Sequence, residues 1–447
     1  MKVSIIGCTH AGTFAAQSIL TNHPDWEVDV FERNDTLSFL SCGIALWVSD
    51  RVSDPQKMFY SSPEQLSSLG AQMHMQHDVL AVDWDKKQLT VKNLVSQEEF
   101  IQKYDKLVIT TGSQPVIPPV PGVDGPHVLH CKNWDDANQL KQNADQIQSA
   151  IVIGSGYIGA ELAEAYSLKQ KDVTLIDMLP HVMAKNFDEN ISEIAEQDYR
   201  DHGVKLQLQE KVVKFEDQDN GVIVTTDQGQ YQADIAVLCV GFRPCTGLFQ
   251  DQLQTLDNGA IIVDEYMQTS QPDVFAAGDA ATVQYNPTQK PDYIPLATNA
   301  VRQGLLIGDN IATATHKYLG TQATSAVELY QRTYAGAGLT VNGAKARGVK
   351  VAHVSVEDNY RPEFMLSTEP VLLNLIWDPQ THRILGGSLT SKYDVSQSAN
   401  TLSLAIQNQM TIEQLAMVDF FFQPNFDKPI NYLSSVAIAA VAQQNQA

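Results

Sequence analysis

The chain has 447 residues, of which 43% are hydrophobic, and its 52 acidic and 30 basic residues leave a formal net charge of -22. This length and ordinary apolar content predict a globular protein of two to four domains rather than a fibrous or disordered one. So acidic a chain repels phosphate backbones, which argues against nucleic acid as a partner.

The first residues and the cysteines indicate where the protein works. Residues 1–7 carry one base and a very short apolar run, too short for a signal peptide or a membrane-spanning helix. The five cysteines include no CxxC pair or metal-ligand spacing and are too sparse for a disulfide scaffold. We therefore expect a cytoplasmic protein without a membrane partner or a metal site.

The N-terminal segment has the pattern of strand, tight turn, helix and strand. Residues 2–6 are apolar and β-branched, residues 7–12 read Gly-Cys-Thr-His-Ala-Gly, and residues 13–20 have helical periodicity. A second strand over residues 27–31 ends at Glu32. This pattern is typical of a unit that binds a dinucleotide.

The chemistry of such a unit depends on its glycines and its acid. Pyrophosphate needs a backbone turn without bulky side chains at a helix start, and an acid after the next strand binds the ribose hydroxyls. Gly7, Gly12 and Glu32 meet these needs. Thr9 occupies the position where a middle glycine is usual, so an ordinary strand-turn-helix is the alternative here.

The same pattern recurs with all three glycines present. Residues 150–153 form an apolar run, residues 154–159 read Gly-Ser-Gly-Tyr-Ile-Gly, and a helix is expected over residues 160–168. A strand over residues 172–176 then ends at Asp177. This second unit predicts another dinucleotide site.

The acid of the second unit bears on the choice of nicotinamide cofactor. Asp177, rather than an Arg cluster, favours a free ribose 2′-hydroxyl and so NAD(H) over NADP(H). His181 and Lys185 lie nearby and offer positive charge for a 2′-phosphate. Tolerance of NADPH therefore stays open.

Three further buried strands with small-residue ends complete the first unit: residues 107–112, 234–244 and 273–279. We predict an α/β protein with two Rossmann-like dinucleotide-binding domains, for FAD and NAD, and a C-terminal α+β domain, which the family resemblance described below identifies as a dimerisation domain. The predicted boundaries are 1–115 and 244–320 for the FAD-binding domain, 116–243 for the NAD(H)-binding domain and 321–447 for the C-terminal domain.

The C-terminal third changes character. Residues 371–377 are largely apolar and are followed by a turn at Asp378-Pro379, which predicts antiparallel sheet with flanking helices. The Phe420-Phe421-Phe422 run is too aromatic to be exposed on a monomer. We expect a homodimer or a tetramer, with packing of these rings inside their own domain as the alternative.

Cys42 lies in the run SFLSCG, ten residues after Glu32, and no second cysteine follows four or five positions later. Without a partner, its sulfur can cycle between a thiolate and an adduct such as a sulfenic acid. Residues 43–47 read as a helix start, whose amide dipoles predict a lowered thiol pKa. A buried, inert cysteine is the alternative.

Further motifs are VFAAGDA at 274–280, LATNAVRQG at 296–304 and FFFQPNFDKPIN at 420–431. With GCTHAG, SFLSCG and GSGYIGAELAEA, the chain resembles, over nearly its whole length, the two-dinucleotide flavoprotein reductases. The resemblance is to the single-cysteine branch, which includes NADH peroxidases, water-forming NADH oxidases and coenzyme A disulfide reductases. Within that branch it resembles most the water-forming NADH oxidases of lactic acid bacteria.

The resemblance implies an enzyme that oxidises two NADH, reduces O2 to water, and uses one FAD per subunit. Cys42 would cycle between thiolate and sulfenic acid, with His10 beside it over the flavin. Tyr157 would cover the flavin until the nicotinamide displaces it, and Glu161 one turn later would face the same space. A solvated loop histidine, a structural tyrosine and a surface acid are the respective alternatives.

The implied binding residues follow the matching motifs. Those for FAD are Gly7, Thr9, His10, Ala11, Gly12, Glu32, Arg33, Cys42, Thr110, Thr111, Gly112, Ser113, Lys132, Gly278, Asp279, Ala297 and Thr298. Those for NAD are Gly154, Gly156, Tyr157, Ile158, Gly159, Asp177 and Gly241. The other cysteines, Cys8, Cys131, Cys239 and Cys245, are expected to be structural.

Two positions bear on the oxidant. The family pattern implies that peroxidases place a glutamate four residues after the active-site histidine and an arginine after Ala-Thr-Asn-Ala, where this chain has Phe14 and Val301. A more apolar pocket at His10 favours O2 over H2O2, although Arg302 is adjacent. The acidic chain disfavours a coenzyme A disulfide reductase, and a weakly active flavin redox sensor is a further alternative.

Overall fold

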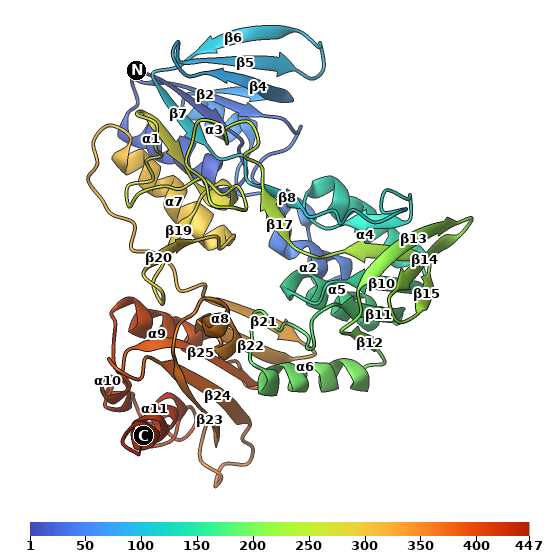
Figure 1. Cartoon of the computed structure of the whole chain (residues 1–447), viewed down its shortest axis with the longest axis vertical. Helices are drawn as coiled ribbons and strands as arrows, with labels where there is room; N and C mark the ends of the chain where they lie inside the picture. Colours follow the sequence, from blue (N-terminus) through green and yellow to red (C-terminus); the bar gives the residue numbers. More distant parts are fainter. Residues whose placement is uncertain (447) are drawn as a thin grey trace.

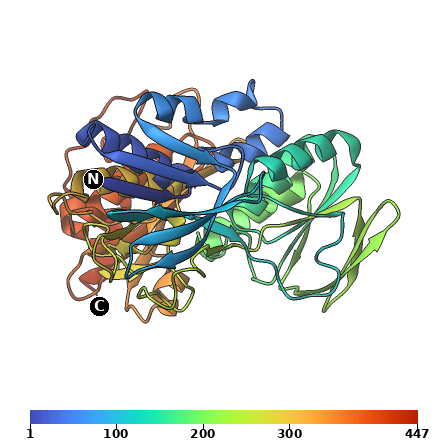
Figure 2. The same ribbon diagram turned by 90° about the horizontal axis from the view of Figure 1, so that it is seen from above.

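The computed structural model describes residues 1–446. In Figure 1 the N-terminal part of the chain lies at the top, the green middle part at the right and the orange and red C-terminal part at the bottom. Seen from above, the N-terminal and C-terminal parts overlap, and the middle part projects to one side (Figure 2). In the described part of the chain, no helix is long and apolar enough to cross a membrane.

The first domain is built on a parallel sheet with strand order β18-β7-β1-β2-β3. The strands are β1 (Lys2–Ile6), β2 (Glu27–Glu32), β3 (Ala71–Met75), β7 (Lys106–Ile109) and β18 (Val274–Ala276). Strand order is out of sequence because β18 returns to this sheet after the whole second domain. The predicted two-part domain therefore has a physical counterpart in one continuous sheet.

Helices and a small sheet cover the two faces of this parallel sheet. On one face lie α1 (His10–Asn22) and α7 (Ala297–Asn310), with α3 (Pro63–Ser68) at the edge. A Cβ on Gly304 would lie 2.4 Å from the carbonyl oxygen of Ala11, so only glycine lets α1 and α7 approach this closely. The other face packs against β4 (His77–Asp83), β5 (Gln88–Asn93) and β6 (Glu99–Lys103).

The second domain repeats this plan with strand order β12-β11-β10-β16-β9, again parallel. Its strands are β9 (Val128–His130), β10 (Ser149–Ile153), β11 (Asp172–Asp177), β12 (Lys205–Leu208) and β16 (Ile235–Leu238). One face carries α4 (Trp134–Gln146), α5 (Tyr157–Leu168) and α6 (Glu189–Asp201). The antiparallel strands β13 (Val212–Gln218), β14 (Gly221–Thr226) and β15 (Gln230–Ala233) cover the other face.

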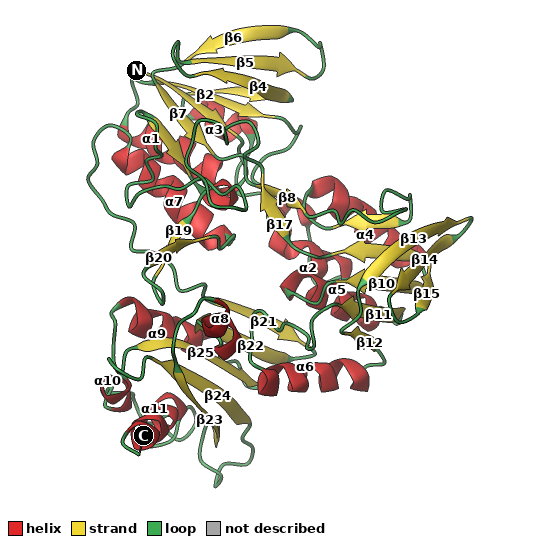
Figure 3. Ribbon diagram, viewed as in Figure 1, coloured by secondary structure: helices red, strands yellow, loops and turns green. Residues whose placement is uncertain are grey.

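A two-stranded ribbon carries the chain between these domains. Strands β8 (Ser113–Pro115) and β17 (Phe242–Pro244) pair antiparallel and lie between the two domains in Figure 3. The predicted boundaries at 115/116 and 243/244 fall in this ribbon, and the division of the chain into domains stays a prediction. After it come β18, the 3-10 turn η3 (Gly278–Ala280) and the hairpin of β19 (Val283–Tyr285) and β20 (Lys290–Asp292).

The C-terminal domain has an antiparallel sheet of order β21-β22-β25-β24-β23, which confirms the antiparallel prediction. The strands are β21 (Ser325–Leu329), β22 (Arg332–Gly338), β23 (Ala352–Asn359), β24 (Pro370–Trp377) and β25 (Ile384–Ser391). The helices are α8 (Val341–Ala346), α9 (Ser396–Gln407), α10 (Ile412–Ala416) and α11 (Tyr432–Gln444).

One segment of the N-terminal part lies against the second domain. After β2 come the 3-10 turns η1 (Ser41–Gly43) and η2 (Pro55–Met58), with α2 (Ile44–Val48) between them. In Figure 1, blue α2 lies among green α4 and α5. Trp47 of α2 stacks on Trp134 of α4, with 5.2 Å between ring centroids. The sequence segment that carries Cys42 is thus packed on the core of the other dinucleotide-binding unit.

Candidate active site

A cavity of about 520 Å³ opens beside the turn between β1 and α1. This volume is in the range of cofactor sites. Thirteen of the predicted FAD residues line it: Gly7, Thr9, His10, Ala11, Glu32, Arg33, Thr110, Thr111, Gly112, Ser113, Lys132, Gly278 and Asp279. Four predicted residues, Gly12, Cys42, Ala297 and Thr298, lie outside this lining.

The first turn is shaped by close backbone approaches. Gly7 has φ +88°, and a Cβ there would lie 2.5 Å from the carbonyl oxygen of Thr110. A Cβ on Gly12 would lie 2.0 Å from the oxygen of Gly7, so this glycine serves packing rather than the cavity lining. The buried Glu32 carboxylate accepts a hydrogen bond of 2.7 Å from the amide of Cys8. The acid therefore braces the turn from the end of β2.

The second turn repeats this arrangement around Asp177. Its carboxylate accepts hydrogen bonds from the amide and the hydroxyl of Ser155, at 2.6 and 2.7 Å. Gly154 has φ +95° and faces the oxygen of Cys239, whereas a Cβ on Gly156 would meet nothing within 4 Å. The middle glycine leaves room that the protein does not fill, which suits the close approach of a pyrophosphate.

A polar cluster lies on the cavity wall where the ribbon meets η3. The Ser113 hydroxyl donates to Asp279 Oδ2 at 2.6 Å, and Lys132 Nζ donates to both, at 3.0 and 3.3 Å. Lys132 also lies 4.3 Å above the ring of Phe242. A cation, a hydroxyl and a carboxylate side by side match the hydroxyls and ring heteroatoms of a flavin dinucleotide, so the lining fits FAD.

His10 projects into the cavity from the first turn of α1. Its ring lies edge-on to Tyr60, with 5.2 Å between centroids, and its buried Nδ1 has no hydrogen-bond partner within residues 1–446. Burial lowers the pKa of His10, an effect that the carboxylate of Asp279 opposes. His10 is therefore neutral at pH 7 and has a free ring nitrogen for proton transfer.

Cys42 lies in η1 and is exposed. Desolvation raises the pKa of its thiol; the negative charge of Glu161 raises it further, and Lys132 lowers it. The prediction of a lowered pKa is therefore wrong. The helical segment is short, with three residues in η1 and five in α2, so its dipole is weak against these two effects.

Tyr157 and Glu161 project from the first turns of α5. The Tyr157 hydroxyl is 2.7 Å from Ser325 Oγ of the C-terminal domain, and burial raises its pKa to about 12. Burial, and then the charge of Glu164, raises the pKa of Glu161 to about 7. Glu161 also acts electrostatically on Cys42, so the two side chains share one region. The structure thus brings Cys42 close to Glu161, one of the two residues predicted for the nicotinamide site.

The remaining predicted NAD residues lie around the second turn. Ile158 and Gly159 are in the first turn of α5, and a Cβ on Gly159 would lie 1.8 Å from the oxygen of Gly154. Gly241, with φ +107°, precedes β17, and its carbonyl accepts a hydrogen bond from Val116. These residues shape the ends of strands β10 and β16, the edge at which doubly wound sheets bind ligands.

Sequence reasoning missed several residues of this site. Gln303 is fully buried, accepts from the amide of Gly278 at 2.9 Å and donates to the carbonyl of Thr282 at 3.0 Å. Gln303 lies in the LATNAVRQG motif, of which only Ala297 and Thr298 were predicted to bind FAD. Cys245 lines the cavity although no role was assigned to it. Tyr60 contacts His10 from a loop whose sequence gave no signal.

Of the residues that bear on the oxidant, Phe14 and Arg302, the neighbour of Val301, have defined side-chain contacts. Phe14 lies edge-on to Tyr60, with 5.8 Å between centroids, so aromatic rings continue beyond His10. Arg302 donates to Asn299 Oδ1 at 2.6 Å and contacts Tyr318. The side chain of Arg302 is thus held by Asn299.

Two Rossmann-like units, a cofactor-sized cavity and a C-terminal antiparallel domain define a two-dinucleotide oxidoreductase. The family described as pyridine nucleotide-disulphide oxidoreductase matches residues 1–304, and its dimerisation domain matches residues 325–432. The chain belongs to this family.

Individual relatives agree with this assignment. An NADH oxidase of Enterococcus faecalis is 51% identical over 443 residues, 99% of either chain. A solved structure of the water-forming NADH oxidase from Lactobacillus brevis bound to NADH has a TM-score of 0.99 and 57% identity, and the match covers 100% of this chain and 99% of that one. An NAD-dependent persulfide reductase from A. fulgidus has a TM-score of 0.96 at 27% identity, covering 100% of this chain and 84% of that one.

Proposed function

We propose that this protein is an FAD-dependent NADH oxidase that reduces O2 to two waters at the expense of two NADH. The observation that carries the proposal is that Cys42, which no second cysteine follows four or five positions later, lies within electrostatic reach of Lys132 and Asp279 on the cavity wall and of Glu161 on α5. One sulfur without a cysteine partner suits oxygen-atom transfer rather than disulfide exchange. The similarity to NADH oxidases across the whole chain supports the same reaction.

Bound FAD supplies two-electron transfer from NADH to oxygen, a chemistry that no side chain of this protein offers. The glycine turn at Gly7, the acid Glu32 and the cluster of Lys132, Ser113 and Asp279 would hold it. Asp177 and the open turn at Gly156 would hold NADH. The Tyr157 ring would yield its place to the nicotinamide as NADH enters.

The proposed cycle uses the Cys42 sulfur as the acceptor of one oxygen atom. One NADH, one proton and one O2 give NAD⁺ and H2O2. The Cys42 thiolate attacks the peroxide, so that an S–O bond forms, the O–O bond breaks and hydroxide leaves to become water with one proton. A second NADH and a proton reduce the resulting sulfenic acid, which returns the Cys42 thiol and releases the second water.

Proton transfer in this cycle falls to His10 and Glu161. Cys42 has a raised pKa and must lose its proton before it attacks, and neutral His10 has a free Nδ1 that can accept it. Glu161, with a pKa of about 7, can supply a proton when the sulfenic acid is reduced. Phe14, without a carboxylate, leaves His10 unpaired, which favours O2 over H2O2 as the incoming oxidant.

The test is the product of Cys42→Ser. Wild-type protein should consume two NADH per O2 without free peroxide, whereas C42S should consume one NADH per O2 and release H2O2. Cys131→Ala, which changes a cysteine buried in the second domain, is the matched control and should keep the ratio of two. An unchanged ratio in C42S would overturn the proposal.

The same assay separates the alternatives. Anaerobic NADH oxidation by H2O2 at a rate well above the aerobic rate would indicate a peroxidase, and oxidation by coenzyme A disulfide would indicate a disulfide reductase. Negligible turnover with all three oxidants would indicate a redox sensor. We also infer a reducing, cytoplasmic setting, because all five cysteines are free.

The working unit in this proposal is a homodimer. Phe421, Phe422 and Phe426 are 67%, 50% and 58% exposed in the single chain, and they lie between α10 and α11 within the residues that match the dimerisation domain. Exposed aromatic clusters of this kind mark interfaces. Light scattering should give the mass of two or four chains, and a monomer at all concentrations would contradict this part of the proposal.

A further inference from the structure

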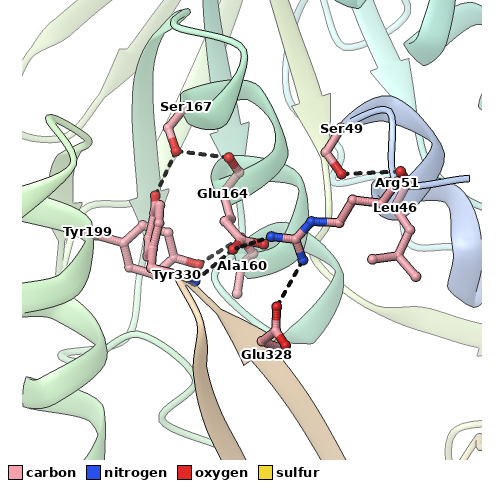
Figure 4. A network of polar contacts seen from close by, with 9 residues as sticks. All are labelled: Leu46, Ser49, Arg51, Ala160, Glu164, Ser167, Tyr199, Glu328 and Tyr330. Atoms are coloured by element: carbon pink, nitrogen blue, oxygen red, sulfur yellow. Dashed lines mark hydrogen bonds and ion pairs between the residues drawn. The ribbon is translucent and has the colours of Figure 1, made fainter. Parts of the chain in front are cut away.

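Glu164 is a buried carboxylate at the core side of α5, one turn after Glu161. It is 4% exposed, and its Oε1 accepts a hydrogen bond of 2.7 Å from the amide of Tyr330. The same oxygen is 3.5 Å from Arg51 Nη2. A buried charge is costly unless it is paired and hydrogen-bonded, so these two partners keep Glu164 in place. Figure 4 shows Tyr330 and Arg51 on opposite sides of Glu164.

Arg51 connects Glu164 to the short helix α2, which follows Cys42 in the chain. Its amide donates to the carbonyl of Leu46 at 2.8 Å, which ends the short helix α2. That helix starts two residues after Cys42. Through its guanidinium, Arg51 also reaches Glu328 of β21, at 3.1 Å. The Arg51–Glu164 contact therefore ties the Cys42 segment to the helix of Tyr157 and Glu161.

The third element in the network is the tip of the hairpin between β21 and β22. Tyr330 and Gln331 form a two-residue turn with φ +51° and +62°, the twist that tight hairpins favour. The Tyr330 hydroxyl is 2.7 Å from Ser167 Oγ at the end of α5, and its ring stacks on His202 with 3.8 Å between centroids. Since Ser325 bonds to Tyr157, β21 touches both ends of α5.

We propose that Glu164 is a positioning residue, which joins Arg51, α5 and the β21–β22 hairpin and so holds Cys42 at a fixed place relative to Tyr157 and Glu161. The inference rests on the proposed oxidase function. When Cys42 is held at this fixed position, the peroxide formed in the first half of the cycle reacts with the sulfur before the peroxide can leave the site. The contacts of Glu164 with Arg51 and with Tyr330 are called the Glu164 joint below. The amount of free H2O2 released is a direct measure of how firmly this joint positions Cys42.

The charge of Glu164 gives the joint a second, independent signature. Burial raises the pKa of Glu164, an effect that the Tyr330 amide and the Arg51 guanidinium oppose and the Glu328 carboxylate reinforces, and His202 also lies near it. The charge of Glu164 in turn raises the pKa of Glu161. Removing the charge of Glu164 while keeping its shape should therefore shift the ionisation of Glu161 to lower pH. A side chain that only filled space would leave that ionisation unchanged.

The experiment compares Glu164→Gln and Arg51→Met with Lys169→Met as the matched control. Glutamine keeps an acceptor for the Tyr330 amide and loses the charge. Lys169 also joins α5 to the end of α2, through Asp50 at 2.6 Å, but that partner is 60% exposed and such a pair contributes little. All three holoenzymes are assayed for H2O2 released per NADH oxidised and for the pH profile of kcat/KM for NADH.

E164Q and R51M should each raise the peroxide fraction by about threefold or more while kcat/KM for NADH stays within about twofold. The inflection near pH 7 should move to lower pH in E164Q, Arg51→Lys should restore the low peroxide fraction, and K169M should match wild type. Wild-type values in both E164Q and R51M, or an equal rise in K169M, would overturn the inference.

Failure of the proposed function can be told apart from failure of the joint. Wild-type protein that does not reduce O2 refutes the oxidase, and the alkylation rate of Cys42 by iodoacetamide without NADH then decides the inference. That rate should rise about threefold in R51M and stay unchanged in K169M. Since Arg51 is 35% exposed, R51M carries this test even if E164Q does not fold.

Discussion

The Asp177 carboxylate accepts two hydrogen bonds from Ser155, one from its amide at 2.6 Å and one from its hydroxyl at 2.7 Å. Glu32 bonds to the amide of Cys8 in the same position of the first turn. Each acid therefore stabilises the glycine-containing turn of its own unit by hydrogen bonding and also presents a negative charge where a ribose would bind. The ring of nearby His181 contacts Glu196, with 3.0 Å between Nδ1 and Oε1.

Asp177→Asn should lower kcat/KM for NADH and reduce the preference for NADH over NADPH. The carboxylate repels a 2′-phosphate and accepts a hydrogen bond from a 2′-hydroxyl. The amide is uncharged and a weaker acceptor, so we expect kcat/KM for NADH to drop about tenfold or more. Steady-state rates with both nucleotides check this. Asp172→Asn, at the exposed start of the same strand, is the control, and an equal drop there would contradict the prediction.

The two dinucleotide units could be predicted because their determinants are local. Gly7 and Glu32, like Gly154 and Asp177, lie within about thirty residues of each other, so sequence spacing alone places them at one strand edge. The antiparallel C-terminal sheet could likewise be predicted from the local pattern of residues 371–377. These patterns describe how neighbouring elements pack and need no knowledge of distant contacts.

The rest of the site depends on contacts between distant segments. Trp47 and Trp134 stack although they are 87 positions apart in the sequence. No pattern in the sequence near Cys42 predicts that the following helix, α2, packs on the second domain. The predicted pKa of Cys42 was wrong for the same reason, because both the desolvation of its thiol and the charge of Glu161 come from the fold rather than from neighbouring residues in the chain. Tyr60, which contacts His10 from such a segment, had no local signature.

Gly156→Ala should weaken NADH binding and leave the fold intact. A Cβ at this position meets no protein atom within 4 Å, so the methyl group fills only the space expected for pyrophosphate. We expect KM for NADH to rise about tenfold with Tm within about 2 °C of wild type. Gly154→Ala is the contrasting variant: its φ of +95° and a Cβ 2.4 Å from the oxygen of Cys239 predict a clear loss of Tm. Equal Tm losses would refute this reading.

Glu161→Gln should change how stability depends on pH. The pKa of Glu161 is raised from 4.5 to about 7 in the folded chain, so the folded state binds a proton more tightly than the unfolded state. Stability therefore falls as pH rises from about 4.5 to about 7, by up to about 3 kcal/mol, and this loss is complete above pH 7. Glutamine does not ionise, so E161Q should gain stability relative to wild type at pH 8 and not at pH 4.5.

Thermal unfolding of the two holoenzymes at both pH values measures this difference. Glu189→Gln is the control, because that carboxylate is 69% exposed and should move neither value. Glu161→Gln should also speed alkylation of Cys42 at pH 8, because it removes a negative charge that raises the pKa of the thiol. A pH-independent difference between E161Q and wild type would show that burial alone, without ionisation, governs this position.

His10→Gln should let peroxide escape and slow the cycle. The imidazole is neutral because burial lowers its pKa, so it can accept the proton of Cys42 at pH 7 and should lose this ability only at a pH below its ordinary value of 6.5. Loss of a general base lowers kcat by about a hundredfold or more. The wild-type profile of kcat should show an acid limb below pH 6.5 that is absent in H10Q. His23→Gln removes a histidine that stacks on Trp26 instead and should keep that limb. An acid limb that persists in H10Q would assign the proton acceptor to another group.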